Sequence, residues 1–141
     1  MMKTGMIWAV AASACLTSGA LAQDAMTIGE FEYSNSCVQC HGAAGKGDGP
    51  LVSFMTGSMP DITQLQKENG GVFPVTWVFG VIDGTAMAGP HGTSEMPAWG
   101  QRYRKAAPEW LGYSGAPGEA EALARLRVLA LVEYVASLQE P

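Results

Sequence analysis

Apolar side chains recur at three- and four-residue spacing in the last part of the chain. This spacing predicts a helix from Glu119 to Leu138, because it places the apolar positions on one face. The stripe comprises Leu123, Leu126, Ala130, Leu131, Tyr134, Val135 and Leu138. Further apolar residues at 128, 129 and 132 widen it, so we expect the helix to be buried on more than one side.

Residues 25–36 are also helical in character. Gly29, Tyr33 and Cys37 are spaced by four and therefore share one helix face. A glycine inside a helix costs roughly 1 kcal/mol relative to alanine. Gly29 is therefore expected at a place where another helix approaches closely.

The chain between these two helices alternates loops and short helical segments. Residues 41–50 hold four glycines and one proline, which predicts a wrapped loop. Its G-x-G-x-G pattern follows no strand, so a phosphate-binding loop is disfavoured. Farther on, Asp61 is a candidate N-cap for a turn through Lys67, and Val75 to Ile82 is an apolar helical segment with Pro74 at its first position. The pattern predicts an all-α fold.

Residues 1–22 have the pattern of a secretory signal peptide. Lys3 supplies the positive charge, residues 6–16 form an apolar core, and Ala20-Leu21-Ala22 is an A-x-A cleavage site. The apolar run is too short for a membrane span. A lipid anchor at Cys15 is the competing interpretation. We expect a mature protein of residues 23–141 that is exported to the periplasm, does not span the membrane and forms one domain.

The charge balance restricts the kinds of partner. The whole chain carries a formal net charge of −5, and removal of Lys3 with the leader leaves seven basic against thirteen acidic side chains, or −6. Such a surface argues against nucleic-acid binding, which needs a basic footprint. An acidic carrier would instead be steered towards basic patches on its partners.

Cys37-Val38-Gln39-Cys40-His41 is a C-x-x-C-H run, which is the attachment signature of haem c. Two thiols three positions apart on one helical turn can reach the two vinyl groups of one haem, and the following histidine can bind the iron. A thioredoxin-like dithiol would require a preceding strand, and a zinc site would require a second pair of ligands. No cysteine follows Cys40. The motif occurs once, so one covalent haem is expected. The nitrogen of His41 that does not bind iron needs a hydrogen-bond acceptor, and the backbone carbonyl of Pro50 is the candidate.

The second chemical signature is the segment Glu95-Met96-Pro97-Ala98-Trp99-Gly100. Met96 lies in a loop well after His41, where a low-spin haem needs its sixth ligand; a methionine there raises the reduction potential and closes the iron to small molecules. The alternatives are His91, one of Met55, Met59 and Met87, or an open sixth position. A copper site built from Met87, His91 and Met96 is a further alternative, since thioethers suit Cu(I).

These motifs and their order resemble the class I cytochrome c domains, with the haem motif near the N-terminus, Met96-Pro97 in a late loop and a terminal helix ending Leu131-x-x-Tyr134-Val135-x-Ser137-Leu138. The glycine loop and the Met-Pro-x-Trp-Gly segment look like the bacterial branch that includes haem c subunits of respiratory oxidases. The resemblance implies an all-α fold in which Gly29 and Tyr33 meet Tyr134 where the first and last helices cross. It also implies one-electron transfer at a partly exposed haem edge.

The sequence therefore predicts an exported one-electron carrier rather than an enzyme. Cys37 and Cys40 are expected to anchor haem c, and His41 and Met96 to ligate its iron. Redox proteins such as an oxidase, a dehydrogenase or a respiratory complex are the expected partners, and a monomer or a complex subunit is the expected state. Alternatives are a fixed subunit of an oxidoreductase complex, with residues 102–117 as a docking element, and a haem-based sensor or peroxidase-like enzyme. Arg102, Arg104 and Lys105 form the candidate basic docking cluster in that stretch.

Overall fold

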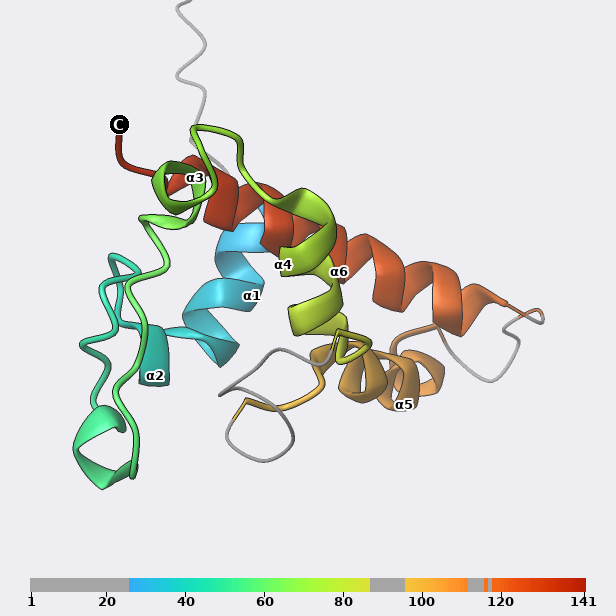
Figure 1. Cartoon of the computed structure of the whole chain (residues 1–141). Coiled ribbons are helices and arrows are strands. Elements are labelled where there is room, and N and C mark those ends of the chain that lie inside the picture. Colours follow the sequence, from blue (N-terminus) through green and yellow to red (C-terminus); the bar gives the residue numbers. More distant parts are fainter. Residues whose placement is uncertain (1–25, 87–95, 112–115, 117) are drawn as a thin grey trace, which may run out of the picture.

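The computed structural model describes residues 26–86, 96–111, 116 and 118–141 (Figure 1). These residues form helices and no strand, so the all-α prediction is confirmed at that level. In chain order the elements are α1 (Ile28–Ser36), α2 (Val38–His41), the 3-10 helix η1 (Val52–Phe54), α3 (Leu65–Glu68), α4 (Val75–Asp83), α5 (Trp99–Leu111) and α6 (Glu119–Ser137).

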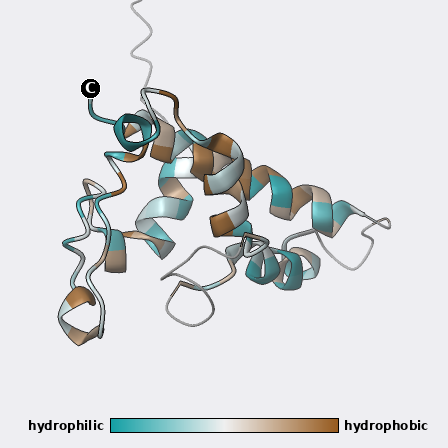
Figure 2. Ribbon diagram, in the orientation of Figure 1, coloured by the Kyte–Doolittle hydropathy of each residue, from teal (hydrophilic) through white to brown (hydrophobic). Residues whose placement is uncertain are grey.

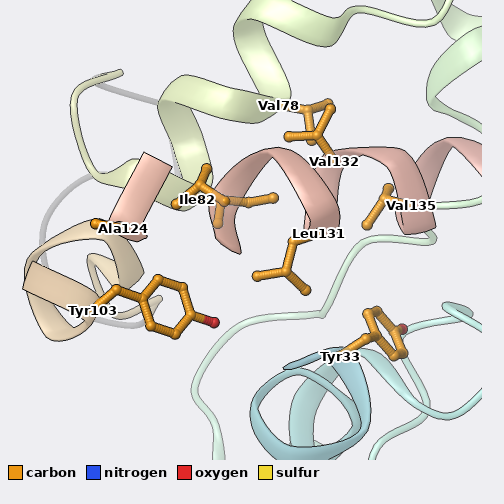
Figure 3. Packing of buried hydrophobic residues seen from close by; sticks show 9 residues of the cluster. Tyr33, Val78, Ile82, Tyr103, Ala124, Leu131, Val132 and Val135 are labelled. Carbon is orange, nitrogen blue, oxygen red and sulfur yellow. The ribbon is translucent and has the colours of Figure 1, made fainter. Parts of the chain in front are cut away.

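The long helix α6 is the element on which the others pack. Helices α1, α4 and α5 all lie against it, and buried apolar side chains from all four helices form one core (Figures 1 and 3). The core residues are Tyr33, Val78, Ile82, Tyr103, Ala124, Val128, Leu131, Val132 and Val135. The hydropathy colouring shows apolar segments on α4 and along α6, whereas α5 is largely hydrophilic (Figure 2).

Helices α1 and α6 cross at Gly29. A Cβ atom at this position would lie 2.1 Å from the carbonyl oxygen of Ala130 and 2.9 Å from Cβ of Tyr134. One helical turn later the rings of Tyr33 and Tyr134 stack, with centroids 5.0 Å apart and planes tilted by 46°. The close approach expected at Gly29 is confirmed, and so is the meeting of Gly29 and Tyr33 with Tyr134.

The boundaries of the predicted helices differ from the observed ones in small ways. Helix α1 begins after Thr27, whose hydroxyl caps it, and Ala25 lies outside the described residues. Helix α3 begins only at Leu65, because the carboxylate of Asp61 binds the N–H and hydroxyl of Thr63 in the preceding turn. Pro74 is the N-cap of α4 rather than its first residue.

Helix α5 was not predicted, because residues 102–117 were assigned only a possible docking role and no secondary structure. Pro108 lies inside the helix and cannot donate a backbone hydrogen bond, which costs about 3 kcal/mol in a helix interior. The helix forms nonetheless because its inner face is well packed: Tyr103 is 4% exposed and Ala107 is fully buried. Tertiary packing here outweighs local propensity.

No helix in the described part of the chain combines the length and the hydropathy that a membrane span needs. The predicted signal peptide, residues 1–22, lies outside the described residues and stays a prediction.

Candidate functional site

Cys37 lies at the junction of two helices. It is the C-cap of α1 and the N-cap of α2, and its N–H donates to the carbonyl of Tyr33 at 2.8 Å. Its own carbonyl accepts from the N–H of His41, also at 2.8 Å, which closes the single turn of α2. The motif residues Cys37, Cys40 and His41 therefore lie on one helical turn, the arrangement that two-point attachment of a haem requires.

The two thiols are free and half-buried. Burial, with a smaller contribution from the neighbouring Cys40, raises the pKa of Cys37 to about 12. A redox-active dithiol has the opposite property, a lowered thiol pKa that makes the thiolate available at neutral pH. In the part of the chain that the structure describes, no three His, Cys, Asp or Glu side chains cluster as a zinc site would require. Both rivals of haem attachment lack structural support.

The glycine loop after His41 folds back onto α2. The N–H groups of Gly47, Gly49 and Leu51 donate to the last carbonyls of the helix, those of His41 (2.9 Å), Cys40 (3.2 Å) and Gln39 (2.8 Å). The backbones approach so closely that a Cβ on Gly49 would lie 2.5 Å from the oxygen of Gln39. The wrapped loop is confirmed, and it fixes the C-terminal end of the turn that carries the histidine.

His41 is buried, with 9% of its surface exposed. The residue that follows it, Gly42, has a φ of 77° and receives a hydrogen bond from the Tyr33 hydroxyl at 2.8 Å. This bond ties the end of α2 to the α1–α6 crossing, so the position of His41 depends on the same contact that packs the two long helices. The role of the exposed Pro50 as acceptor for His41 stays a prediction.

Met96 is held between the end of α4 and the start of α5. A Cβ on Gly84 would lie 2.4 Å from Cβ of Ala98, and a Cβ on Gly100 would lie 1.9 Å from the buried carboxylate of Asp83. These two close approaches join the helices at the point where the methionine segment enters α5. The Met96 side chain is partly buried and packs against the core.

Two adjoining hollows bring the predicted residues together. The outer hollow has a cavity volume of about 40 Å³, and the inner hollow, named for the core residues that line it, has about 60 Å³; both are partly open to solvent. The outer hollow is lined by Ser36, Cys37, Cys40, His41, Ser58, Met59, Met96, Pro97 and Trp99. The inner hollow is lined by Tyr33, Cys37, His41, Ile62, Leu65, Trp77, Val78, Val81, Ile82, Met96, Leu131 and Val135. Cys37, His41 and Met96 line both.

The donor set fits a covalently attached, His/Met-ligated haem. Two thiols, one imidazole and the two thioethers of Met59 and Met96 line the outer hollow, and the remaining lining of both hollows is mostly apolar or aromatic. An apolar lining with a few convergent polar groups is typical of cofactor sites.

Among the described residues, Met59 is the alternative sixth ligand that the structure brings to the site, since it also lines the outer hollow. Met55 is absent from the linings of both hollows. Met87 and His91 lie outside the described residues, so the bis-histidine and copper alternatives that use them stay untested.

The chain matches no protein-family model. Comparisons with curated proteins and with solved structures also find no match. The functional argument therefore depends on the geometry of these hollows and on the chemistry of the residues that line them.

A buried charge network that joins α1, α5 and α6 was not predicted. Glu32 is 4% exposed, accepts a hydrogen bond from the Tyr103 hydroxyl at 2.8 Å and forms an ion pair with Arg127. The guanidinium of Arg127 lies 4.0 Å from the ring centroid of Trp110. No spacing rule predicts the network, because the acid and the arginine are far apart in the sequence.

The proposed basic cluster on residues 102–105 does not form one surface. Arg104 is bound to the buried Asp83 at 3.1 Å and to Glu121 at 3.4 Å, so it bridges α4 and α6. Arg102 is exposed and lies 4.8 Å over the ring of Trp99, and Lys105 is exposed. The expectation of a three-residue docking cluster is corrected, since Arg104 serves helix packing.

Proposed function

We propose that the protein is an exported one-electron carrier with a single covalently attached haem c and a class I cytochrome c fold. The observation that carries the proposal is the shared lining of the two hollows: Met96, which is far from Cys37 and His41 in the sequence, lines the same space as these two residues. Their thiol, imidazole and thioether groups are the set that such a haem needs.

The roles of the chain's residues follow from their chemistry. Cys37 and Cys40 would each form a thioether with one vinyl group: the sulfur bonds to one vinyl carbon and the proton goes to the other, with no oxidant required. His41 would bind iron on one side and Met96 on the other. The bound haem supplies a one-electron iron couple.

The surroundings of these residues suit electron transfer without bond-making chemistry. The inner hollow is lined by apolar side chains such as Ile62, Val78 and Leu131. A low local dielectric and a thioether ligand both favour the reduced iron and so raise the potential. The hydrogen bond from the Tyr33 hydroxyl to the Gly42 carbonyl holds the turn that carries His41 in place, which would keep the structural change on electron transfer small.

The acidic mature chain would meet redox partners through their basic patches, in the periplasm. Only two members of the predicted basic cluster, Arg102 and Lys105, are exposed. Attraction to an acidic partner therefore has little support from this surface.

The sixth ligand separates a carrier from a sensor or a peroxidase-like enzyme. The ferric protein should show the weak far-red sulfur-to-iron charge-transfer band, the ferrous protein should hardly bind carbon monoxide, and a redox titration should follow a one-electron slope of about 59 mV per decade. Met96→Ala should lose the band and open the iron to carbon monoxide. Met59→Leu is the matched control, a methionine on the same hollow whose loss should leave the band unchanged.

The opposite pattern would reject the assignment. If Met59→Leu abolishes the band and Met96→Ala keeps it, Met59 is the ligand. If the wild-type protein binds carbon monoxide readily, the pure carrier function fails and a ligand-binding haem protein takes its place.

A further inference from the structure

The outer side of the α1–α6 pair is an apolar groove. It has a volume of about 850 Å³ and is lined on α1 by residues 27–30 and on α6 by residues between Ala122 and Ser137. A smaller hollow lined by Met26, Phe31 and Leu123 continues it at one end and shares Thr27, Ile28 and Leu126 with it.

Large apolar side chains on this face are half exposed or more. The exposed fractions are 57% for Met26, 51% for Ile28, 53% for Phe31, and 50% for both Leu126 and Leu129. Single exposed hydrophobic residues are ordinary, but a contiguous apolar patch rimmed by polar residues marks an interaction site. The groove is such a patch, since these residues line two hollows that share part of their walls.

The two charged residues of α6 that line the groove, Arg125 and Glu133, are placed symmetrically about Leu129. Arg125 precedes Leu129 by four residues and Glu133 follows it by four, so all three lie on one ridge. Each charge is about 6 Å along the axis from Leu129, at 1.5 Å rise per residue. Both are exposed, and none of the ion pairs found among the described residues includes either one.

We propose that this face is a homodimer interface, in which two copies of α6 pack antiparallel about a two-fold axis at Leu129. In a two-fold arrangement the same patch is used by both copies and must complement itself. The axis at Leu129 places Arg125 of each copy level with Glu133 of the other, which forms two ion pairs. The exposed apolar residues of both copies then cover one another across the groove.

The charge pattern favours a second copy over other occupants. An anionic membrane would be attracted by a basic rim, whereas this groove is lined by Glu30 and Glu133 against the single Arg125. An unrelated protein would not require equal and opposite charges at equal distances from one residue. The interface shares no lining residue with the hollows of the candidate haem site, so the proposal does not depend on the proposed function.

Charge reversal tests the pairing directly. The full chain, expressed with its own N-terminal segment in a host that attaches haem c, is measured by sedimentation velocity and native mass spectrometry over a wide dilution series. The wild-type protein should be a concentration-dependent dimer. Arg125→Glu and Glu133→Arg each create two like-charge contacts, and each should weaken dimerisation by about tenfold or more. The double variant Arg125→Glu/Glu133→Arg should restore the dimer, because the pairs are re-formed with their signs exchanged.

Lys67→Glu, a reversal at an exposed position of α3 outside the groove, is the matched control and should leave the dimer unchanged. Leu129→Asp places two acids at the axis and should give a folded monomer, with helix content checked by circular dichroism. Dimers with this charge response but without attached haem would support the interface and defeat the proposed function. A wild-type protein that stays monomeric overturns the interface. This holds also if the monomer sediments with phosphatidylcholine or anionic vesicles, because the groove would then bind lipid instead of a second copy. A double variant as dissociated as the single ones overturns it as well.

Discussion

Replacement of Gly29 by valine tests the helix crossing on which the site depends. The Cβ that valine adds would lie 2.1 Å from the oxygen and 2.8 Å from the carbon of the Ala130 carbonyl. Both are backbone atoms of a buried helix, so no side-chain rotation can relieve the contact. The two helices must move apart by more than 1 Å to restore an ordinary van der Waals separation.

The expected cost is a difference between two effects. Replacing glycine in a helix stabilises by up to about 1 kcal/mol, and by less for a β-branched residue. Overpacking typically costs about 1–3 kcal/mol. Separation of the helices also weakens the stacking of Tyr33 on Tyr134, and such aromatic pairs contribute about 0.5–1.5 kcal/mol. We therefore expect Gly29→Val to lower the free energy of unfolding by about 2–3 kcal/mol.

Guanidinium unfolding followed by circular dichroism measures this change. With a slope of about 2–6 kcal/mol/M, the transition midpoint should fall by about 0.3–1.5 M. Ser34→Val, at an exposed position of the same helix, is the matched control and should change stability by less than about 0.5 kcal/mol. A Gly29→Val variant as stable as the wild-type protein, measured at the same protein concentration, would show that the close crossing does not exist.

Three further changes probe other parts of the structure. Glu32→Ala leaves the charge of Arg127 without its buried partner and should destabilise by about 3 kcal/mol in urea unfolding, whereas a loss below about 0.5 kcal/mol would mean that the network is unimportant. Arg104→Ala should cost about 1–3 kcal/mol because Asp83 is buried, and an unchanged thermal midpoint would contradict the bridge between α4 and α6. Hydrogen bonds from the side chain and backbone of Thr63 lower the pKa of Asp61. The stability that the ionised carboxylate contributes is therefore complete above its unfolded pKa of about 3.9, and it is lost as the pH falls through the lower folded value. Asp61→Asn should therefore flatten the acid side of the stability–pH curve, and an identical slope would refute this.

The sequence predicted helices α1 and α6 well: apolar residues at helical spacing indicated α6, and the four-residue spacing of Gly29, Tyr33 and Cys37 indicated one face of α1. Helix α6 ends within one residue of its predicted boundary, and the glycine on α1 correctly indicated the close approach of a second helix. Both features are local: a stripe of apolar residues and one residue without a side chain. The resemblance to class I cytochrome c domains indicated that the last helix crosses the first at Tyr134, and Tyr134 does stack on Tyr33 there.

Helix α5 was missed because its local signals oppose its formation. Gly100 and Pro108 are poor helix residues, and they hid the helical periodicity that the apolar and polar residues of α5 do have. The helix depends on the fit of Tyr103 and Ala107 against the rest of the core, which a single sequence does not reveal. The same reason explains why Arg104 was assigned to a docking surface, since its partner Asp83 becomes its neighbour only after folding.

The residues of the candidate site could be predicted from the sequence, but the position and shape of the hollows that they line could not. The C-x-x-C-H spacing specifies one helical turn, and the structure confirms that turn. Met96 was chosen by its position in the chain, and folding brings it to the hollows that Cys37 and His41 line. Met59 could not be recognised as the nearest rival, because its presence at the outer hollow depends on the course of the loop after the glycines.

Covalent attachment of haem is the central claim, and it has a direct measurement. The protein, expressed in a host that attaches haem c, is denatured, extracted with acidified acetone and analysed by intact and peptide mass spectrometry. We predict that the haem stays with the polypeptide, that the intact mass exceeds the processed chain by one haem, and that the added mass lies on the peptide containing Cys37 and Cys40. Replacing both cysteines with alanine should abolish the added mass. Haem that extracts completely, or a matured wild-type chain that carries none, would contradict the account.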